Sequence, residues 1–208
     1  MALTAAQRAR LIEARDAIDA VLTEEVAATA PPIPNAPTGR REIAWGAKVS
    51  PVFRERVWWI CDQLGIDPDY LMSCMAFESG RTFSPSVRNM AGSGATGLIQ
   101  FMPSTARALG TSTDALAAMT AESQLNFVYK YFRPYYGRLK TLADVYMAIL
   151  WPKGVGQPES YAIFTQGGVT YRQNAGLDTN KDGRVTKLEA STKVTALYSE
   201  GRRAENMA

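Results

Sequence analysis

The sequence contains no histidine and only two cysteines, Cys61 and Cys74, among its 208 residues. Without histidine, the chain cannot carry Ser-His-Asp or Cys-His catalytic machinery, and it cannot bind a metal through imidazole ligands. Two cysteines are also too few for a disulfide framework or a cysteine-ligated zinc site. Because cysteine is among the residue types most often buried, we expect both to be buried free thiols.

Long apolar segments are also missing. Charged residues at positions 8, 10, 13, 15 and 16 interrupt the start of the chain, which excludes the apolar core of a signal peptide. The uncharged run at 89–106 is rich in glycine, serine and threonine and contains a proline, so it is not a membrane span. We therefore expect a protein made in the cytoplasm without a signal peptide and with no membrane insertion.

Strong charge of either sign is absent, because the net charge is +3 and the isoelectric point is near 8.9. A mildly basic protein suits an anionic polymer such as the bacterial cell wall. It lacks the dense stripe of lysine and arginine typical of nucleic-acid-binding proteins, so we expect no nucleic-acid partner. The hydrophobic fraction of 46% is typical of one well-packed globular core, and we expect a monomer.

Three parts follow one another along the chain. Apolar residues at helical spacing within 5–28 predict an amphipathic N-terminal helix over 1–30. Residues 31–43 are rich in proline and predict an extended linker. Residues 44–208 form the main domain, which again shows helical spacing of apolar residues and no convincing alternating strand pattern.

We expect the main domain to be mainly α, with one irregular glycine-rich loop. Gly65 is placed to end one helix, and Asp67 and Pro68 are placed to begin the next. Thr141 and Asp144 have the spacing of a capping box. The expected helices lie within 50–65, 66–80, 120–137, 141–152 and 188–201.

Glu78 stands out because it follows an apolar run and no further acidic residue occurs before Asp114. Helical spacing places it on the face of Leu71, Cys74 and Met75, at the end of that face. Partial burial there is expected to raise the pKa of the carboxyl, so that it can donate a proton near neutral pH. The alternative is a helix end at which Glu78 simply turns to solvent.

The segment "NMAGSGATGLIQFMPSTA" at 89–106 combines three glycines with a sudden apolar run. Glycines allow positive φ angles and a close approach of the backbone to a ligand. Such a loop can offer backbone N–H and C=O groups to the amide and hydroxyl groups of an amino sugar. An ordinary structural turn is the alternative interpretation.

Together, "ESG" and "GATGLIQFMPSTA" resemble the signature of the soluble lytic transglycosylase (SLT) family of the lysozyme-like superfamily, in the style of phage-encoded endolysins or virion-associated members. The resemblance covers about 50–155. The matching residues are Glu78, Ser79, Gly94, Ala95, Gly97, Leu98, Gln100, Met102, Pro103, Thr105 and Ala106.

This resemblance implies a lysozyme-like (goose-type or SLT-like) helical domain that acts on the glycan strands of bacterial peptidoglycan, in the periplasm or cell wall after phage-mediated release or delivery. It implies Glu78 as the single catalytic acid/base and phage virion proteins among the partners. The substrate-binding residues that it implies are Ser79, Gln100, Met102, Tyr146 and either Asn89 or Ser93. The family's usual Tyr-Asn-Ala-Gly reads "YMAI" here, which weakens the assignment of Tyr146.

A single carboxylate suits a transglycosylase because the C6 hydroxyl of N-acetylmuramic acid (MurNAc) replaces water as the nucleophile. The MurNAc–GlcNAc bond then breaks to give a 1,6-anhydroMurNAc end, with no cofactor needed for the chemistry. Hydrolytic muramidases use a second carboxylate, for which Asp114, Glu122, Asp144 and Glu159 remain candidates. A non-catalytic wall-binding or virion structural module is a further alternative.

A second motif, "DTNKDGRVTKLE" at 178–189, meets the template of an EF-hand calcium loop. Hard oxygen ligands are expected from Asp178, Asn180 and Asp182, from the Arg184 carbonyl, and from a bidentate Glu189. The segment before the loop is a poor helix, whereas the one after it is a good helix. We expect one structural Ca²⁺ site, and a polar surface turn is the alternative.

Overall fold

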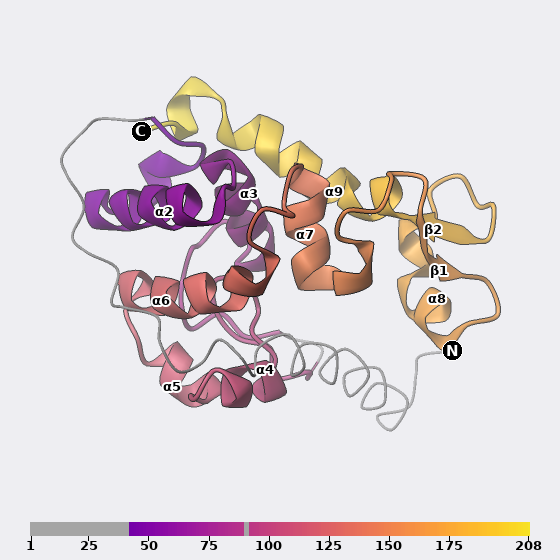
Figure 1. Ribbon diagram of the computed structural model, residues 1–208, viewed down its shortest axis with the longest axis horizontal. Coiled ribbons are helices and arrows are strands. Elements are labelled where there is room, and N and C mark those ends of the chain that lie inside the picture. The colour runs from indigo at the N-terminus through magenta and orange to yellow at the C-terminus, as the bar shows by residue number, and fades with distance from the viewer. Residues whose placement is uncertain (1–41, 90–91) are drawn as a thin grey trace.

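The computed structural model of the protein describes residues 42–89 and 92–208, in which helices predominate (Figure 1). The mainly α class expected from the sequence is confirmed. The predicted N-terminal helix over 1–30 and nearly all of the linker over 31–43 lie outside the described residues. Within the described ranges, none of the helices is long and apolar enough to cross a membrane.

The elements follow the expected order along the chain. The α-helices are α2 (Pro51–Leu64), α3 (Pro68–Glu78), α4 (Pro103–Ala108), α5 (Thr113–Ala117), α6 (Ala121–Phe132), α7 (Leu142–Leu150), α8 (Val169–Asn174) and α9 (Lys187–Gly201). The strands are β1 (Ala162–Thr165) and β2 (Arg184–Thr186), and short 3-10 turns occur at Gly46–Lys48, Arg133–Tyr135, Pro152–Gly154, Ala175–Leu177 and Ala204–Asn206.

The helix ends follow the predicted capping residues. Gly65 closes α2 in the left-handed conformation, with φ of 65°. Asp67 accepts a hydrogen bond from the Asp69 backbone N–H at the start of α3, and Pro68 is the first helical residue. The capping box of Thr141 and Asp144 is formed at the start of α7. Each of these local predictions is confirmed.

Helix α3 forms the centre of the domain. It contacts α2, α7 and α9, and six consecutive residues from Leu71 to Ala76 are buried. A helix that is apolar on every side is stable only when other elements cover it. Figure 1 shows α7 in the middle of the molecule and α9 running along it from β2 toward α2.

A two-stranded antiparallel sheet lies at the end of the molecule opposite α2 (Figure 1). Thr165 pairs with Arg184 and Phe164 with Val185, and an irregularity separates these pairs from the one between Ala162 and Thr186. The sequence prediction contained no strands. Strands of four and three residues are too short to show a convincing alternation of apolar and polar residues.

The last helix closes on the beginning of the described chain. The indole N–H of Trp45 donates to the Leu197 carbonyl at 3.1 Å, and the Ile43 N–H donates to the Ala208 carbonyl at 3.0 Å. Trp45 is 1% exposed, so α9 is docked through a buried contact. The C-terminal segment is therefore part of the same core as α2 and α3.

Candidate active site

Glu78 is the last residue of α3, directly after the buried part of that helix. Its side chain is partly buried, whereas Cys74, one turn earlier, is fully buried. Burial raises the pKa of the Cys74 thiol well above its usual value, and the nearby charge of Glu78 raises it further. The carboxyl group of Glu78 therefore lies where the apolar core meets the next loop.

Both cysteines are buried free thiols, as predicted.

Ser79 organises the turn that follows Glu78. Its hydroxyl donates to the Met75 carbonyl at 2.6 Å and accepts from the Phe83 N–H at 3.0 Å. Arg81 and Phe83 have positive φ angles of 68° and 50°, which are uncommon for residues other than glycine and are concentrated at functional sites. Ser79 is 1% exposed, so its hydroxyl is used to shape the turn.

Helix α7 brings Tyr146 to the end of α3. The ring of Tyr146 meets that of Phe77, the neighbour of Glu78, edge to face with 5.5 Å between centroids. Helix α7 is also tied to α6 because the Tyr131 hydroxyl donates to the Ala148 carbonyl at 2.7 Å. The structure thus places two of the predicted site residues, Glu78 and Tyr146, on neighbouring elements at one end of α3.

The glycine-rich loop forms a tight hairpin that precedes α4. Thr96 and Phe101 exchange backbone hydrogen bonds of 3.0 and 2.9 Å. Within the hairpin Gln100 has a φ of 52°, and its side-chain amide donates to the Val87 and Gly97 carbonyls. Met102 is the N-cap residue of α4 and is 4% exposed. The part of the loop from Thr96 to Met102 is therefore held in one shape by hydrogen bonds, both within the hairpin and to Val87.

Asn89 and Ser93 lie on the outer part of this loop. Asn89 is exposed, and its backbone N–H donates to the Ala95 carbonyl at 2.9 Å. Ser93 is partly exposed, and its hydroxyl accepts from the Ala95 N–H at 3.3 Å. Both side chains are accessible to a ligand, and the geometry gives neither a preference over the other.

Three of the four candidate second carboxylates are paired with other side chains. Asp114 pairs with Arg88 on the surface, and Glu122 accepts from the Ser50 hydroxyl at 2.5 Å. Asp144 is 6% exposed and pairs with Lys187. The remaining candidate, Glu159, is exposed. A carboxylate held by a buried cation is a poor general base, because protonation would leave the cation uncompensated.

The electrostatics of Asp144 show how tightly it is held. Burial alone would raise the pKa of the carboxyl, but hydrogen bonds from Lys187, the Gly156 N–H and Thr141 outweigh burial and leave the pKa below its ordinary value. The Lys187 ammonium donates to Asp144 at 2.5 Å and to the Gln157 carbonyl at 2.9 Å. Lys187 was not predicted from the sequence, because it lies 43 positions from Asp144 in the chain.

The predicted calcium loop places three of its ligand side chains together. The backbone N–H of Asp182 donates to the side-chain oxygens of both Asp178 and Asn180, at 3.2 and 2.9 Å. Asp178 also accepts from the Gly183 N–H and the Tyr171 hydroxyl. The side-chain oxygens of loop positions 1 and 3 therefore converge on the backbone of position 5, and hard oxygens of this kind are the ligands that calcium prefers.

The twelfth loop residue has a different role in this structure. The Glu189 carboxylate caps α9 by accepting from the Thr186 N–H and hydroxyl, and it also accepts from Thr179. Arg184, the predicted carbonyl ligand, lies in β2. Within 42–89 and 92–208, no group of three or more His, Cys, Asp or Glu side chains is arranged to hold a metal. Bidentate binding by Glu189 would require its carboxylate to leave the capping box.

Gln124, a fully buried polar residue of α6, was also not predicted from the sequence. Its neighbours on the buried face of the helix include the apolar residues Leu125 and Val128. A polar side chain among apolar ones on a helix face signals an internal hydrogen-bonding role, because a buried polar group is nearly always paired. Its contacts with the glycine-rich loop are described below.

Comparison with known protein families gives one match, and no curated protein matches the chain. The match is to the model of the family described as "Transglycosylase SLT domain" and covers residues 60–150. This range includes most of α2, all of α3 to α7, Glu78 and the glycine-rich loop. The match supports the lytic transglycosylase family, whose members are enzymes acting on peptidoglycan, and it agrees with a lysozyme-like helical domain.

Proposed function

We propose that the protein is a peptidoglycan lytic transglycosylase in which Glu78 is the sole general acid/base. The observation that carries this proposal is the place of Glu78 within the matched segment, partly buried where the apolar helix α3 meets an ordered loop. Low polarity around a carboxyl favours its protonated form, which is the form that can donate a proton to a leaving group.

The proposed reaction consumes no water. Glu78 protonates the glycosidic oxygen while the bond from that oxygen to C1 of MurNAc breaks, releasing GlcNAc with a free hydroxyl. The MurNAc C6 hydroxyl then attacks C1 and returns its proton to Glu78. The product is a 1,6-anhydroMurNAc end, and the carboxyl group is again protonated.

The surrounding residues would bind the sugar chain. Gln100 and the backbone of Met102 lie on the ordered hairpin and are assigned to the N-acetylated sugar, with Asn89 or Ser93 beside them. Tyr146 is assigned a role next to Glu78 because its ring contacts Phe77. Ser79 is assigned to the shape of the turn rather than to direct contact, since its hydroxyl is buried and doubly hydrogen-bonded.

Replacement of Glu78 by glutamine tests this assignment, because the amide keeps the shape of the side chain but cannot donate an acidic proton. We expect Glu78→Gln to lose clearing of purified peptidoglycan by at least about 100-fold, the scale of general acid catalysis. Glu205→Gln, which changes an exposed carboxylate outside the matched segment, is the control and should clear normally. Equal clearing by wild type and Glu78→Gln would instead indicate a non-catalytic wall-binding or virion module.

We also propose that the loop 178–189 binds one structural Ca²⁺. The proposed ligands are Asp178, Asn180, Asp182, the Arg184 carbonyl and Glu189. This proposal is supported by the spacing of the motif and by the side-chain oxygens of Asp178 and Asn180, which both accept from the backbone N–H of Asp182. Calcium would link the turn before β2 and the first residue of β2 to the first turn of α9, and it would take no part in the chemistry.

Calorimetric titration tests the calcium proposal. Wild type is expected to bind one Ca²⁺, and its melting temperature should rise with added calcium, since a ligand at 100 times its Kd stabilises the folded state by about 2.7 kcal/mol. Asp182→Asn should weaken both effects, whereas Glu159→Gln should leave them intact. An absence of heat and of thermal stabilisation in the wild type would refute the site.

The proposed substrate fixes where the protein acts. Peptidoglycan lies in the periplasm or cell wall, so the protein would reach its substrate after phage-mediated release or delivery. Phage virion proteins are proposed partners on the basis of the resemblance to phage-encoded members.

A further inference from the structure

The buried amide of Gln124 connects three separate segments. Its oxygen accepts from the Leu98 backbone N–H at 2.7 Å in the glycine-rich loop. Its nitrogen donates to the Leu116 carbonyl at 2.9 Å, near the end of α5, and to the Pro85 carbonyl at 3.1 Å, in the segment after Glu78. One side chain of α6 therefore holds both loop segments that follow the proposed catalytic residue.

The hydrogen-bond partners of Gln124 determine the orientation of its side-chain amide. The Leu98 N–H can only donate, whereas the Pro85 and Leu116 carbonyls can only accept, so oxygen and nitrogen cannot exchange places. Gln124 is 0% exposed. Removal of its amide would leave buried backbone groups without partners, and each such group carries a desolvation penalty. An apolar replacement is therefore expected to loosen the loop rather than leave it unchanged.

Gly97 is shaped to this side chain. Its φ is +84°, and a Cβ atom at this position would lie 2.2 Å from the amide oxygen of Gln124. Gln100, three residues further along the hairpin, donates to the Gly97 carbonyl at 3.1 Å. A shift of the Gln124 side chain would therefore also move Gly97 and, through it, Gln100, the residue assigned to sugar binding.

We propose that Gln124 is a positioning residue that holds the glycine-rich loop in the shape that binds the N-acetylated sugar, without itself touching the substrate. This inference rests on the proposed function. If Gln124 is lost, the binding-competent loop becomes a smaller fraction of the population, and the apparent affinity falls by that fraction. The substitution should therefore raise KM and leave the catalytic step at Glu78 intact.

Gln124→Met tests this role, because methionine has a similar length and no amide. We expect backbone hydrogen exchange at Leu98 to accelerate by about 10-fold or more. On soluble glycan strands, KM should rise about 10-fold while kcat changes less than about 2-fold. Val128→Ala, a change at a fully buried residue of the same helix, is the control: it should lower stability without a selective change at Leu98 or in KM.

A test on the wild type covers the case in which Gln124→Met does not fold. The side-chain amide protons of Gln124 and the Leu98 N–H should exchange far more slowly than the N–H of exposed Asn180. In addition, Gly97→Ala and Gln124→Ala should be less than additive in loop exchange when combined, since the second change makes room for the new Cβ. Fast exchange of the Gln124 amide, or strict additivity, would overturn the inference.

The activity data separate this inference from the proposed function. A wild type that cleaves no glycan refutes the proposed function and, with it, the substrate part of the inference. An active Gln124→Met with unchanged Leu98 exchange refutes the inference alone. A loss confined to kcat, with KM unchanged, would likewise refute a positioning role in substrate binding.

Discussion

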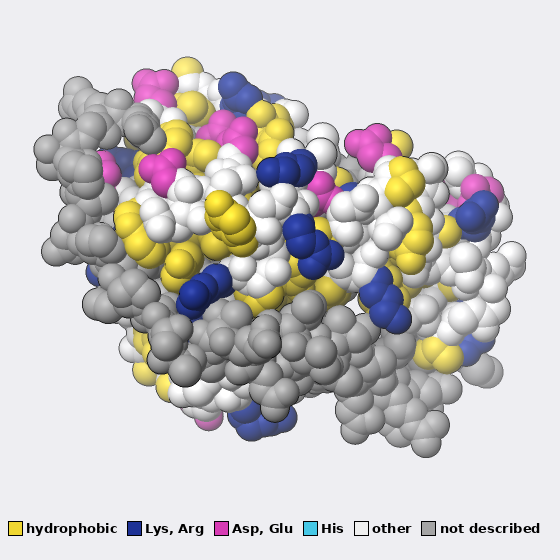
Figure 2. Space-filling view, in the orientation of Figure 1, with side chains coloured by type: hydrophobic (Ala, Val, Ile, Leu, Met, Phe, Trp, Pro, Cys, Tyr) yellow, Lys and Arg dark blue, Asp and Glu magenta, His cyan; other side chains and the backbone are white. Residues whose placement is uncertain are grey.

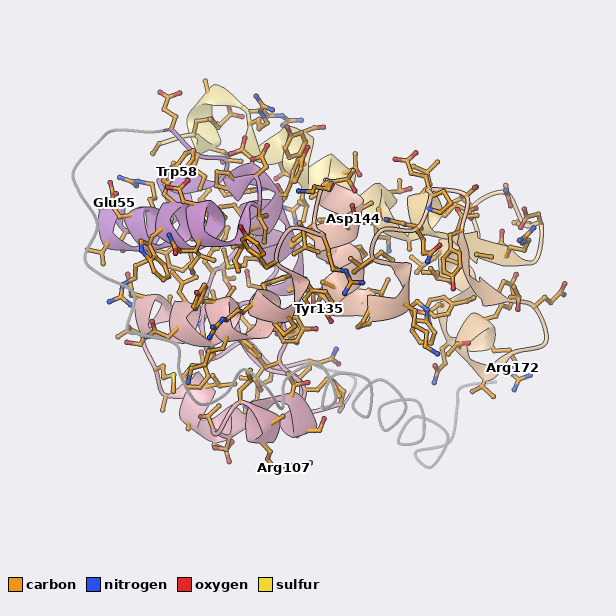
Figure 3. All side chains as sticks on the ribbon, viewed as in Figure 1. Glu55, Trp58, Arg107, Tyr135, Asp144 and Arg172 are labelled. Carbon is orange, nitrogen blue, oxygen red and sulfur yellow. The ribbon has the colours of Figure 1, made fainter. Side chains whose placement is uncertain are left out.

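At the scale of single residues, a few buried polar side chains determine how distant segments meet. Asp144 and Lys187 form an ion pair with side-chain exposures of 6% and 3%. Figure 3 shows Asp144 projecting from α7 toward the end of the molecule that carries the strands. The pair joins α7, inside the matched segment, to the first residue of α9, outside it.

Removal of one partner of this pair should be strongly destabilising. We expect Lys187→Met to lower the free energy of unfolding by about 3–5 kcal/mol, because the Asp144 charge is left buried without compensation. The double variant Asp144→Leu, Lys187→Met should regain much of that loss. Asp114→Asn, which breaks the exposed pair with Arg88, should cost less than about 1 kcal/mol. Urea unfolding measures all three, and equal losses at both pairs would contradict this view of the interior.

The same ion pair predicts that the protein loses stability at acid pH. The pKa of Asp144 is lowered in the folded state, so the unfolded state binds more protons at acid pH. Its contribution is fully present above the unfolded value of about 3.9 and is lost as the pH falls through the lower folded value. Urea unfolding measured from pH 7 to pH 2.5 should therefore show a midpoint concentration that decreases once the pH is below about 4. In the Asp144→Asn variant this decrease in stability with pH should be smaller. A decrease as steep as that of the wild type would contradict the role given to Asp144.

At the scale of elements, α9 supports α3, the helix that ends at Glu78. It contacts both α3 and α7, and its end packs tightly on Trp45. A Cβ at Gly201 would lie 2.3 Å from the indole nitrogen of Trp45, which itself donates to Leu197. The absence of a side chain at Gly201 therefore permits the docking of α9.

Gly201→Ala should destabilise the protein even though alanine favours helix. Overpacking against Trp45 is expected to cost about 1–3 kcal/mol, more than the gain in helix propensity. Gly176→Ala is the matched control, since no atom lies within 4 Å of its Cβ position and its φ is not positive. Thermal unfolding that ranks Gly201→Ala at or above the wild type would contradict this docking.

The helices were predictable because their signals are local. Asp67, Pro68 and Gly65 mark helix ends through hydrogen bonds and dihedral angles of adjacent residues. The strands were missed because they are too short for a period to emerge. Helix α8 was also not expected before the predicted calcium loop, since its six residues bury no side chain and so carry no apolar stripe.

The site was predictable only in part, for a related reason. Glu78 and the glycine-rich loop are close in sequence and carry their signal in adjacent residues. Gln124 and Lys187 act across 26 and 43 positions, and nothing near them in the chain indicates their partners. Tertiary hydrogen bonds of this kind become visible only when the helices are placed in space.

At the scale of the whole molecule, the folded unit extends beyond the matched segment. The α9 helix, the strands and the C-terminal residues lie after residue 150. Of these, α9 contacts α3, and α9 and the last residue form hydrogen bonds with Trp45 and Ile43. Figure 2 shows lysine and arginine side chains dispersed over the described part of the visible face, with no continuous stripe there.

Truncation tests whether the matched segment depends on the elements that follow it. A fragment that ends at residue 150 would expose the faces of α3 and α7 that α9 covers, and it would leave Asp144 without Lys187. We expect this fragment to show no cooperative thermal transition by circular dichroism, whereas the full chain shows one. A sharp transition in the fragment would show that the matched segment folds independently.

Cleavage of purified peptidoglycan in water labelled with ¹⁸O, followed by mass spectrometry of the products, tests the central claim most directly. A reaction that runs through the C6 hydroxyl and Glu78 predicts new MurNAc ends in the 1,6-anhydro form, one water lighter than a reducing end and free of ¹⁸O. New reducing ends that carry ¹⁸O would show that water is the nucleophile and would contradict the transglycosylase mechanism in favour of a muramidase.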